Sequence, residues 1–290
     1  MKQIQWFPGH MSKALREIGE RVKVVDIVIE VVDARAPISS RNPELDKLIG
    51  NKQHLILINK KDLANEQVTK NWITHFKGLG FGALAIEATR VNYNEVKQAC
   101  LTLLKEKFDK EKAKGLRPRA IRALIVGIPN VGKSTLINRL AKRKAANVEN
   151  RPGVTKSQQL IKIDKDFELL DTPGVLWHNF EEKEIGIKLA LIGTIKQNIL
   201  PKEELCFRLL KYLTNYKKGV ISARYNLEEI VVETEEDSYK LLDMIGVKRG
   251  LIQKGNVVDL EATIQRVLNE FSNGILGRFS LDGEDVIWLD

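Results

Sequence analysis

Several residue types and patterns are scarce in this 290-residue chain, and their scarcity narrows the classes to which it can belong. The only two cysteines, Cys100 and Cys206, are far apart, which excludes a disulfide framework and a cysteine-based metal site. Both lie in apolar helical contexts typical of core residues, as in a protein of a reducing compartment. No uncharged apolar run approaches the roughly 18 residues of a membrane helix. Because the first residues contain no apolar signal region, we expect a cytoplasmic protein without a membrane partner.

The charge of the chain is abundant and uneven. Residues 1–179 carry 32 Lys/Arg against 19 Asp/Glu, whereas residues 180–290 carry 15 against 19. The positive excess gathers at Lys105–Arg122 and again at Arg139–Lys144. Such clusters indicate either a polyanion partner, which in the cytosol is usually RNA, or merely solvated helix faces. Composition leaves both interpretations open, and the length fits one large or two modest domains.

The stretch 127–135, Gly-Ile-Pro-Asn-Val-Gly-Lys-Ser-Thr, matches a phosphate-binding P-loop. The apolar run 121–126 predicts a buried strand before it, and a helical pattern follows it. In that setting the backbone N–H groups and the helix N-terminus hold a phosphate anion. Lys133 would reach the β- and γ-phosphates, and the Ser134 hydroxyl would ligate Mg²⁺. The sequence therefore predicts binding of a nucleoside triphosphate.

A second motif, Asn59-Lys60-Lys61-Asp62, follows a strand predicted at 55–58. Asp62 would accept hydrogen bonds from N1–H and the 2-amino group of guanine, Asn59 would anchor the loop, and the stem of Lys60 would cover the base. Adenine lacks both donors, so a carboxylate facing it would stay unpaired. After a strand predicted at 83–86, Ala88 occupies the position at which a GTPase directs a backbone N–H to guanine O6. That match is weak because Glu87 replaces the usual serine.

A third motif, Asp-Thr-Pro-Gly at 171–174, follows a strand predicted at 167–170. Asp171 would hold the water shell of Mg²⁺, the Gly174 N–H would contact the γ-phosphate, and Thr155 would complete the Mg²⁺ shell. Both segments would be switches that the γ-phosphate orders. The predicted nucleotide contacts are Asn59, Lys60, Asp62, Ala88, Asn130, Val131, Gly132, Lys133, Ser134, Thr135, Thr155 and Gly174. The predicted Mg²⁺ ligands are Ser134, Thr155 and Asp171.

The order of these motifs differs from that of a Ras-like GTPase, in which the P-loop comes first and the Asn-Lys-x-Asp motif last. Here the parts are cyclically shifted, which is physically allowed because the termini of a domain usually lie close together. We predict an α/β fold: a circularly permuted GTPase domain at residues 1–178, with a six-stranded, mostly parallel sheet and helices on both faces. An all-α domain would occupy residues 179–290, with helices at 182–191, 203–216, 227–230, 237–245 and 259–271.

The shifted order closely resembles that of the circularly permuted ribosome biogenesis GTPase A family. The opening Trp-Phe-Pro-Gly-His-Met at 6–11, the stretch 31–37 and the stretch 277–281 also resemble that family, so the resemblance spans the chain. It implies a GTPase that binds GTP and GDP and acts in late maturation of the large ribosomal subunit. It also implies partners among ribosomal RNA and ribosomal proteins, and we expect neither DNA binding nor oligomers.

Two residues acquire a possible catalytic role from the resemblance. Val175 occupies the position at which Ras-like enzymes keep a water-orienting glutamine, and valine cannot polarise water. The resemblance assigns catalysis to His10, which could otherwise be a structural residue at the start of a helix. Asn130 matches an asparagine with which similar GTPases bind K⁺ beside the phosphates, and a loop-capping side chain is its alternative.

Three functions remain open from the sequence. The first is an assembly factor for an RNA particle whose GTPase acts as a release switch. The second is a P-loop phosphotransferase that uses GTP on a small acceptor, against which the Asn59–Asp62 motif and the switch motif argue. The third is a module that binds GTP or GDP without useful hydrolysis, which Val175 makes conceivable. The first function agrees with the most motifs. Because residues 180–290 are net acidic, charge favours the GTPase domain for much of the RNA contact.

Overall fold

The computed structural model describes residues 8–142, 160–172, 183–195 and 201–283, without the side chains of residues 8–12 and 142. The chain divides into two compact units, one within residues 1–179 and one within residues 180–290. The boundary predicted between residues 178 and 179 lies outside the described residues. In the part of the chain that is described, none of the helices combines the length and apolarity needed to cross a bilayer.

The first unit contains a six-stranded sheet with the strand order β3-β2-β1-β4-β6-β5. Its strands are β1 (Ile27–Asp33), β2 (Gln53–Asn59), β3 (Gly82–Ala85), β4 (Ile121–Val126), β5 (Leu160–Asp164) and β6 (Phe167–Asp171). Only β5 runs antiparallel to its neighbour, so the predicted mostly parallel sheet is confirmed. All seven residues of β1 are buried, as expected for a strand covered on both faces.

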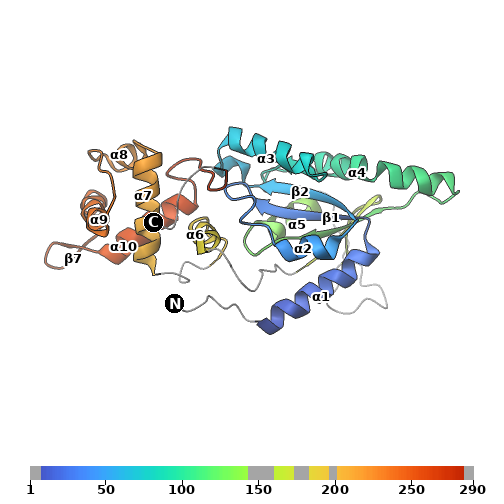
Figure 1. Ribbon diagram of the computed structural model, residues 1–290, viewed down its shortest axis with the longest axis horizontal. Coiled ribbons are helices and arrows are strands. Elements are labelled where there is room, and N and C mark those ends of the chain that lie inside the picture. The colour runs from blue at the N-terminus through green and yellow to red at the C-terminus, as the bar shows by residue number, and fades with distance from the viewer. Residues whose placement is uncertain (1–7, 143–159, 173–182, 196–200, 284–290) are drawn as a thin grey trace. The chain divides into compact units, whose positions relative to one another are not determined.

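Helices lie along both faces of this sheet (Figure 1). They are α1 (Pro8–Val24), α2 (Pro43–Ile49), the short 3₁₀ helix η1 (Lys61–Leu63), α3 (Glu66–Gly78), α4 (Tyr93–Ala113) and α5 (Lys133–Lys142). Residues of α1, α2 and α3 pack with Val28 and Val32, which share one face of β1. On the opposite face, Leu103 of α4 approaches Gly82 and Leu55 so closely that a side chain at Gly82 would collide with it.

Short polar signals in the sequence start the helices that follow the strands. Asn42, Asn65 and Asn92 each precede a helix, and each side chain accepts a hydrogen bond from a backbone N–H of the first turn. Such caps satisfy donors that the helix itself leaves unpaired. The first strand begins only at Ile27, because α1 continues through Val24, whose side chain is 60% exposed.

The second unit is mostly helical. It contains α6 (Lys183–Leu191), α7 (Lys202–Tyr216), α8 (Val220–Tyr225), α9 (Glu235–Arg249), the two-residue strands β7 (Ile252–Gln253) and β8 (Val257–Val258), and α10 (Leu260–Ser272). The hairpin of β7 and β8 is an addition to the predicted all-α domain.

The helix predicted at Leu227–Ile230 is wrong, because the helix lies earlier, at α8. Asn226 adopts a left-handed conformation (φ 54°) that ends α8. Residues 227–233 have no regular secondary structure, and the Val232 N–H donates to the Thr214 hydroxyl instead of to a helical carbonyl.

Candidate nucleotide site

The three predicted motifs emerge from one edge of the sheet. Asp33 at the end of β1 is the register partner of Asn59 at the end of β2. Asp171 at the end of β6 pairs in register with Ile125 of β4, two residues before the P-loop begins. Carboxyl ends of parallel strands are where α/β sheets bind nucleotides. The topology therefore brings together segments that are more than 100 residues apart in the sequence.

Glycine is required at both ends of the P-loop. Gly127 and Gly132 have φ angles of 144° and 103°, which other residues rarely adopt. A Cβ at Gly127 would lie 2.5 Å from the carbonyl oxygen of Val31, and a Cβ at Gly132 would collide with the Asn59 side chain. The loop therefore packs directly against β1 and against the Asn59–Asp62 motif.

Lys133 supplies a buried cation inside this loop. Its side chain is 8% exposed, and Nζ donates hydrogen bonds of 2.9 and 2.7 Å to the carbonyl oxygens of Gly127 and Ile128. Burial lowers the pKa of Lys133 to about 8, although the nearby Asp171 carboxylate opposes this shift. Among the described residues, no carboxylate forms a salt bridge with Lys133. A phosphate is the ligand that best compensates such a cation.

Asn59 joins the predicted base-reading loop to the P-loop. Its side chain is buried, and Nδ2 donates a 2.7 Å hydrogen bond to the carbonyl oxygen of Val131, 72 residues later. Its Oδ1 accepts a 2.9 Å bond from the Ala88 N–H. One amide thus holds three loops in a fixed relation. The Ala88 N–H thus donates to Asn59, and its contact with guanine O6 remains a prediction.

Lys60 makes the second link, with φ 61° and Nζ 3.0 Å from the carbonyl oxygen of Asn130. The fully buried Asp33 holds Lys60 in place, with Oδ2 2.9 Å from Nζ. Asp33 also accepts bonds of 2.9 and 2.8 Å from the Arg35 guanidinium. Sequence reasoning gave Asp33 no role. The available signal was its position at the end of a largely apolar run, next to the strand that leads into Asn59.

Asp62 lies in η1 and is exposed, which leaves its carboxylate accessible to a ligand. Asn130 is also exposed and has a positive φ of 58°, a conformation that asparagine tolerates better than most residues. Its carbonyl oxygen accepts the hydrogen bond from Lys60. The two roles predicted for its side chain, a K⁺ ligand or a cap of the loop, remain predictions.

The predicted Mg²⁺ side of the site has suitable oxygen donors. Ser134 and Thr135 are exposed at the start of α5, whereas Val131 of the P-loop is buried. Burial raises the pKa of Asp171, whose carboxylate has no ion-pair partner among the described residues. Its backbone is fixed by Arg21, whose Nη1 donates a 2.6 Å bond to the Asp171 carbonyl. Hydroxyl and carboxylate oxygens are the ligands that Mg²⁺ prefers, so these residues fit the ion.

Three predicted site residues cannot be located in the site. The backbone of His10 belongs to α1, but its side chain is outside the described atoms. Thr155 and Gly174 lie outside the described residues altogether. Their roles remain predictions.

A second polar cluster, formed by Glu30, His54 and Asp46, has the composition of a metal site. Arg41 already occupies it, with Nη2 3.0 Å from Glu30 Oε2 and 2.6 Å from Asp46 Oδ1. The cluster therefore works as an ion-pair network beneath α2, and a metal cation would have to displace the guanidinium.

Comparisons with known proteins agree with this geometry. The sequence profile described as "50S ribosome-binding GTPase" matches residues 122–222. Ribosome biogenesis GTPase A of Bacillus cereus is 49% identical over 280 residues, which cover 96% of this chain and 93% of the relative. Ribosome biogenesis GTPase A of Thermotoga maritima is 32% identical over 96% of this chain and 94% of the relative. The crystal structure of GNP-bound YlqF from T. maritima has a TM-score of 0.63 at 27% identity and covers 95% of this chain and 100% of that chain.

Proposed function

The chain belongs to the ribosome biogenesis GTPase A family and is a GTPase, and on this premise we propose that it assists late maturation of the large ribosomal subunit. It binds the subunit in the GTP state and leaves after hydrolysis. The observation that carries the proposal is the hydrogen bonding of Asn59 and Lys60 to the P-loop at 2.7 and 3.0 Å. This bonding couples a loop suited to guanine with a loop suited to phosphates.

In the proposed reaction, Asp62 selects guanine and Lys133 neutralises the β- and γ-phosphates of GTP. Ser134, Asp171 and Thr155 would hold Mg²⁺, which would supply further positive charge against the phosphates. Asn130 would hold K⁺ beside the same phosphates, with loop capping as its alternative role. Since Val175 cannot orient the attacking water, His10 is the proposed catalyst. The ribosomal subunit would bring the catalytic groups into position, and hydrolysis would be slow without it.

His10→Ala tests the catalytic assignment. We expect the variant to bind GDP like the wild type but to lose most of the hydrolysis that large subunits stimulate, at least about a hundredfold, which is the typical contribution of a general base. Comparing rates in K⁺ and Na⁺ buffers tests Asn130 in the same assay. An unchanged stimulated rate in the variant would remove His10 as the catalyst.

For the RNA contact we propose the surface formed by Lys105, Lys112, Lys114 and Arg117. All four are exposed, and none has a carboxylate partner among the described residues. Their neighbours Lys107 and Arg119 are instead engaged with Asp26. Unpaired cations favour the polyanion interpretation over a merely solvated helix face. We place the protein in the cytoplasm, where its proposed partner, the ribosomal subunit, is assembled, and we expect it to be a monomer.

Alanine at Lys112, Lys114 and Arg117 should weaken subunit binding and reduce its salt dependence by about one counterion for each phosphate that is no longer neutralised. Lys70→Ala is the matched control, because Lys70 is exposed on α3 but already pairs with Glu66 at 2.7 Å. Cosedimentation with large subunits at several salt concentrations measures both quantities. Equal effects of the control and the triple variant would refute the proposed surface.

A further inference from the structure

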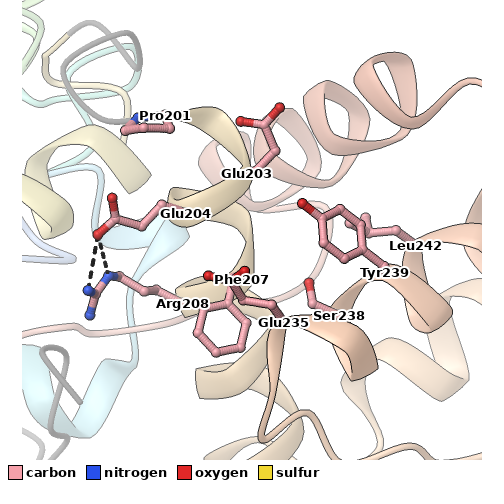
Figure 2. Close-up of a pocket in the computed structure, with 9 residues that line it drawn as sticks. All are labelled: Pro201, Glu203, Glu204, Phe207, Arg208, Glu235, Ser238, Tyr239 and Leu242. Atoms are coloured by element: carbon pink, nitrogen blue, oxygen red, sulfur yellow. Dashed lines mark hydrogen bonds and ion pairs between the residues drawn. The ribbon is translucent and has the colours of Figure 1, made fainter.

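A cavity of about 350 Å³ lies in the second unit, between the first turns of α7 and α9 (Figure 2). It has no role in the nucleotide site. Its lining residues are Pro201, Glu203, Glu204, Phe207, Arg208, Glu235, Ser238, Tyr239 and Leu242. The volume falls within the range of pockets that hold small ligands or single side chains of a partner.

The charged groups of this pocket are of two kinds. Glu204 is already neutralised, since it lies 3.1 Å from Arg208 and 3.0 Å from Lys183. Glu203 and Glu235 are exposed, and neither carboxylate has an ion-pair or hydrogen-bond partner among the described residues. Acidic residues in a first turn stabilise a helix, and that alone explains why they occur there. It does not explain the rest of the lining.

The remaining lining is aromatic, apolar and hydroxylic. Phe207 and Tyr239 stand on either side of the pocket, Tyr239 is 41% exposed, and Leu242 adds an apolar wall. Ser238 is only 4% exposed, and its hydroxyl has no hydrogen-bond partner among the described residues. Figure 2 shows this hydroxyl pointing into the space between Glu203, Phe207 and Tyr239. An unpaired hydroxyl that faces a cavity can exchange a hydrogen bond with a polar group of a ligand there.

We propose that this pocket binds a lysine or arginine side chain from a basic segment of a partner protein. Carboxylates attract the cation, aromatic faces stabilise it, and the apolar wall accommodates its aliphatic stem. The overall charge agrees, because residues 180–290 carry 19 Asp/Glu against 15 Lys/Arg. An RNA backbone would be repelled by the two free carboxylates. The pocket thus gives the second unit a protein contact, whereas the proposed function assigns RNA to the first unit.

The test uses the full-length protein and a fluorescently labelled nine-residue oligoarginine peptide, with binding measured by anisotropy at physiological salt. Glu203→Gln combined with Glu235→Gln should weaken peptide binding about tenfold, as expected for the loss of two partly exposed ion pairs. Tyr239→Ala, which leaves the charge unchanged, should weaken it about threefold.

The matched control combines Glu228→Gln with Asp243→Asn, which removes the same charge from exposed positions of the second unit outside this pocket. The control should retain wild-type affinity. An equal loss in the control, or an unchanged affinity in the pocket variants, would overturn the proposal. Binding of an oligouridine probe should not depend on Tyr239. If Tyr239→Ala weakened binding of oligouridine but not of the peptide, the proposal would also be overturned.

Discussion

The connection between the Asn59–Asp62 motif and the P-loop can be tested most directly by replacing Asn59 with alanine. The substitution removes the acceptor of the Ala88 N–H and the donor to the Val131 carbonyl, and both groups are in buried surroundings. Leaving each group unpaired costs about 1–3 kcal/mol, so the two together amount to about 2–6 kcal/mol. We expect the free energy of unfolding to fall by that amount. We also expect GDP affinity to fall at least about tenfold, since the nucleotide must then order both loops itself.

Urea titration measures the first quantity and calorimetric titration with GDP the second. Asn71→Ala is the control, because Asn71 is exposed on α3 and accepts only a 3.1 Å bond from Gln67. Its effect should stay within about 0.5 kcal/mol, as for most surface substitutions. If Asn59→Ala kept both the wild-type urea midpoint and the wild-type GDP affinity, the coupling of the two loops would be refuted.

Three further changes test other contacts. Asp62→Asn replaces a carboxylate acceptor by an amide that can donate to the 2-oxo group of xanthine. GTP turnover should therefore fall at least about tenfold, and xanthosine triphosphate should become a substrate. Competition between the two nucleotides measures this change in specificity. Because burial lowers the pKa of Lys133 to about 8 and a phosphate would raise it, GDP binding near pH 8 should take up a proton and weaken as pH rises; calorimetry in two buffers of different ionisation enthalpy detects the uptake. Although burial alone would raise the pKa of Asp33, Arg35 and Lys60 lower it from 3.8 to about 2, which contributes about 2 kcal/mol of stability. This contribution is present above pH 3.8 and lost as pH falls through about 2, so the stability difference between Asp33→Asn and the wild type should shrink in acid urea titrations.

The sequence predicts the fold well where local sequence pattern and burial favour the same secondary structure. The run at 121–126 is mostly apolar, as burial of β4 requires, and the positive φ angles at Gly127 and Gly132 are conformations that other residues rarely adopt. The motifs could therefore be assigned to the ends of strands. Their mutual contacts could not, because the bond between Asn59 and Val131 depends on sheet order and register.

Other features depend on tertiary contacts that leave little local signal. Asp33 looks like an ordinary polar residue after a strand until Lys60 and Arg35 are seen beside it. The helix predicted at Leu227–Ile230 is wrong because Asn226 adopts a left-handed conformation that ends α8 just before it. The pocket between α7 and α9 is likewise invisible in the sequence, since its acidic residues look like ordinary first-turn residues of two separate helices.

We propose that this GTPase acts as a switch on the large ribosomal subunit. The most direct test of this proposal is GTP turnover by the purified protein in K⁺ buffer, with and without large subunits. We expect slow hydrolysis alone and strong stimulation by the subunit, because Val175 stands where Ras-like enzymes keep a water-orienting glutamine. Tight nucleotide binding without any stimulation would contradict the account and would favour a module that only senses GTP.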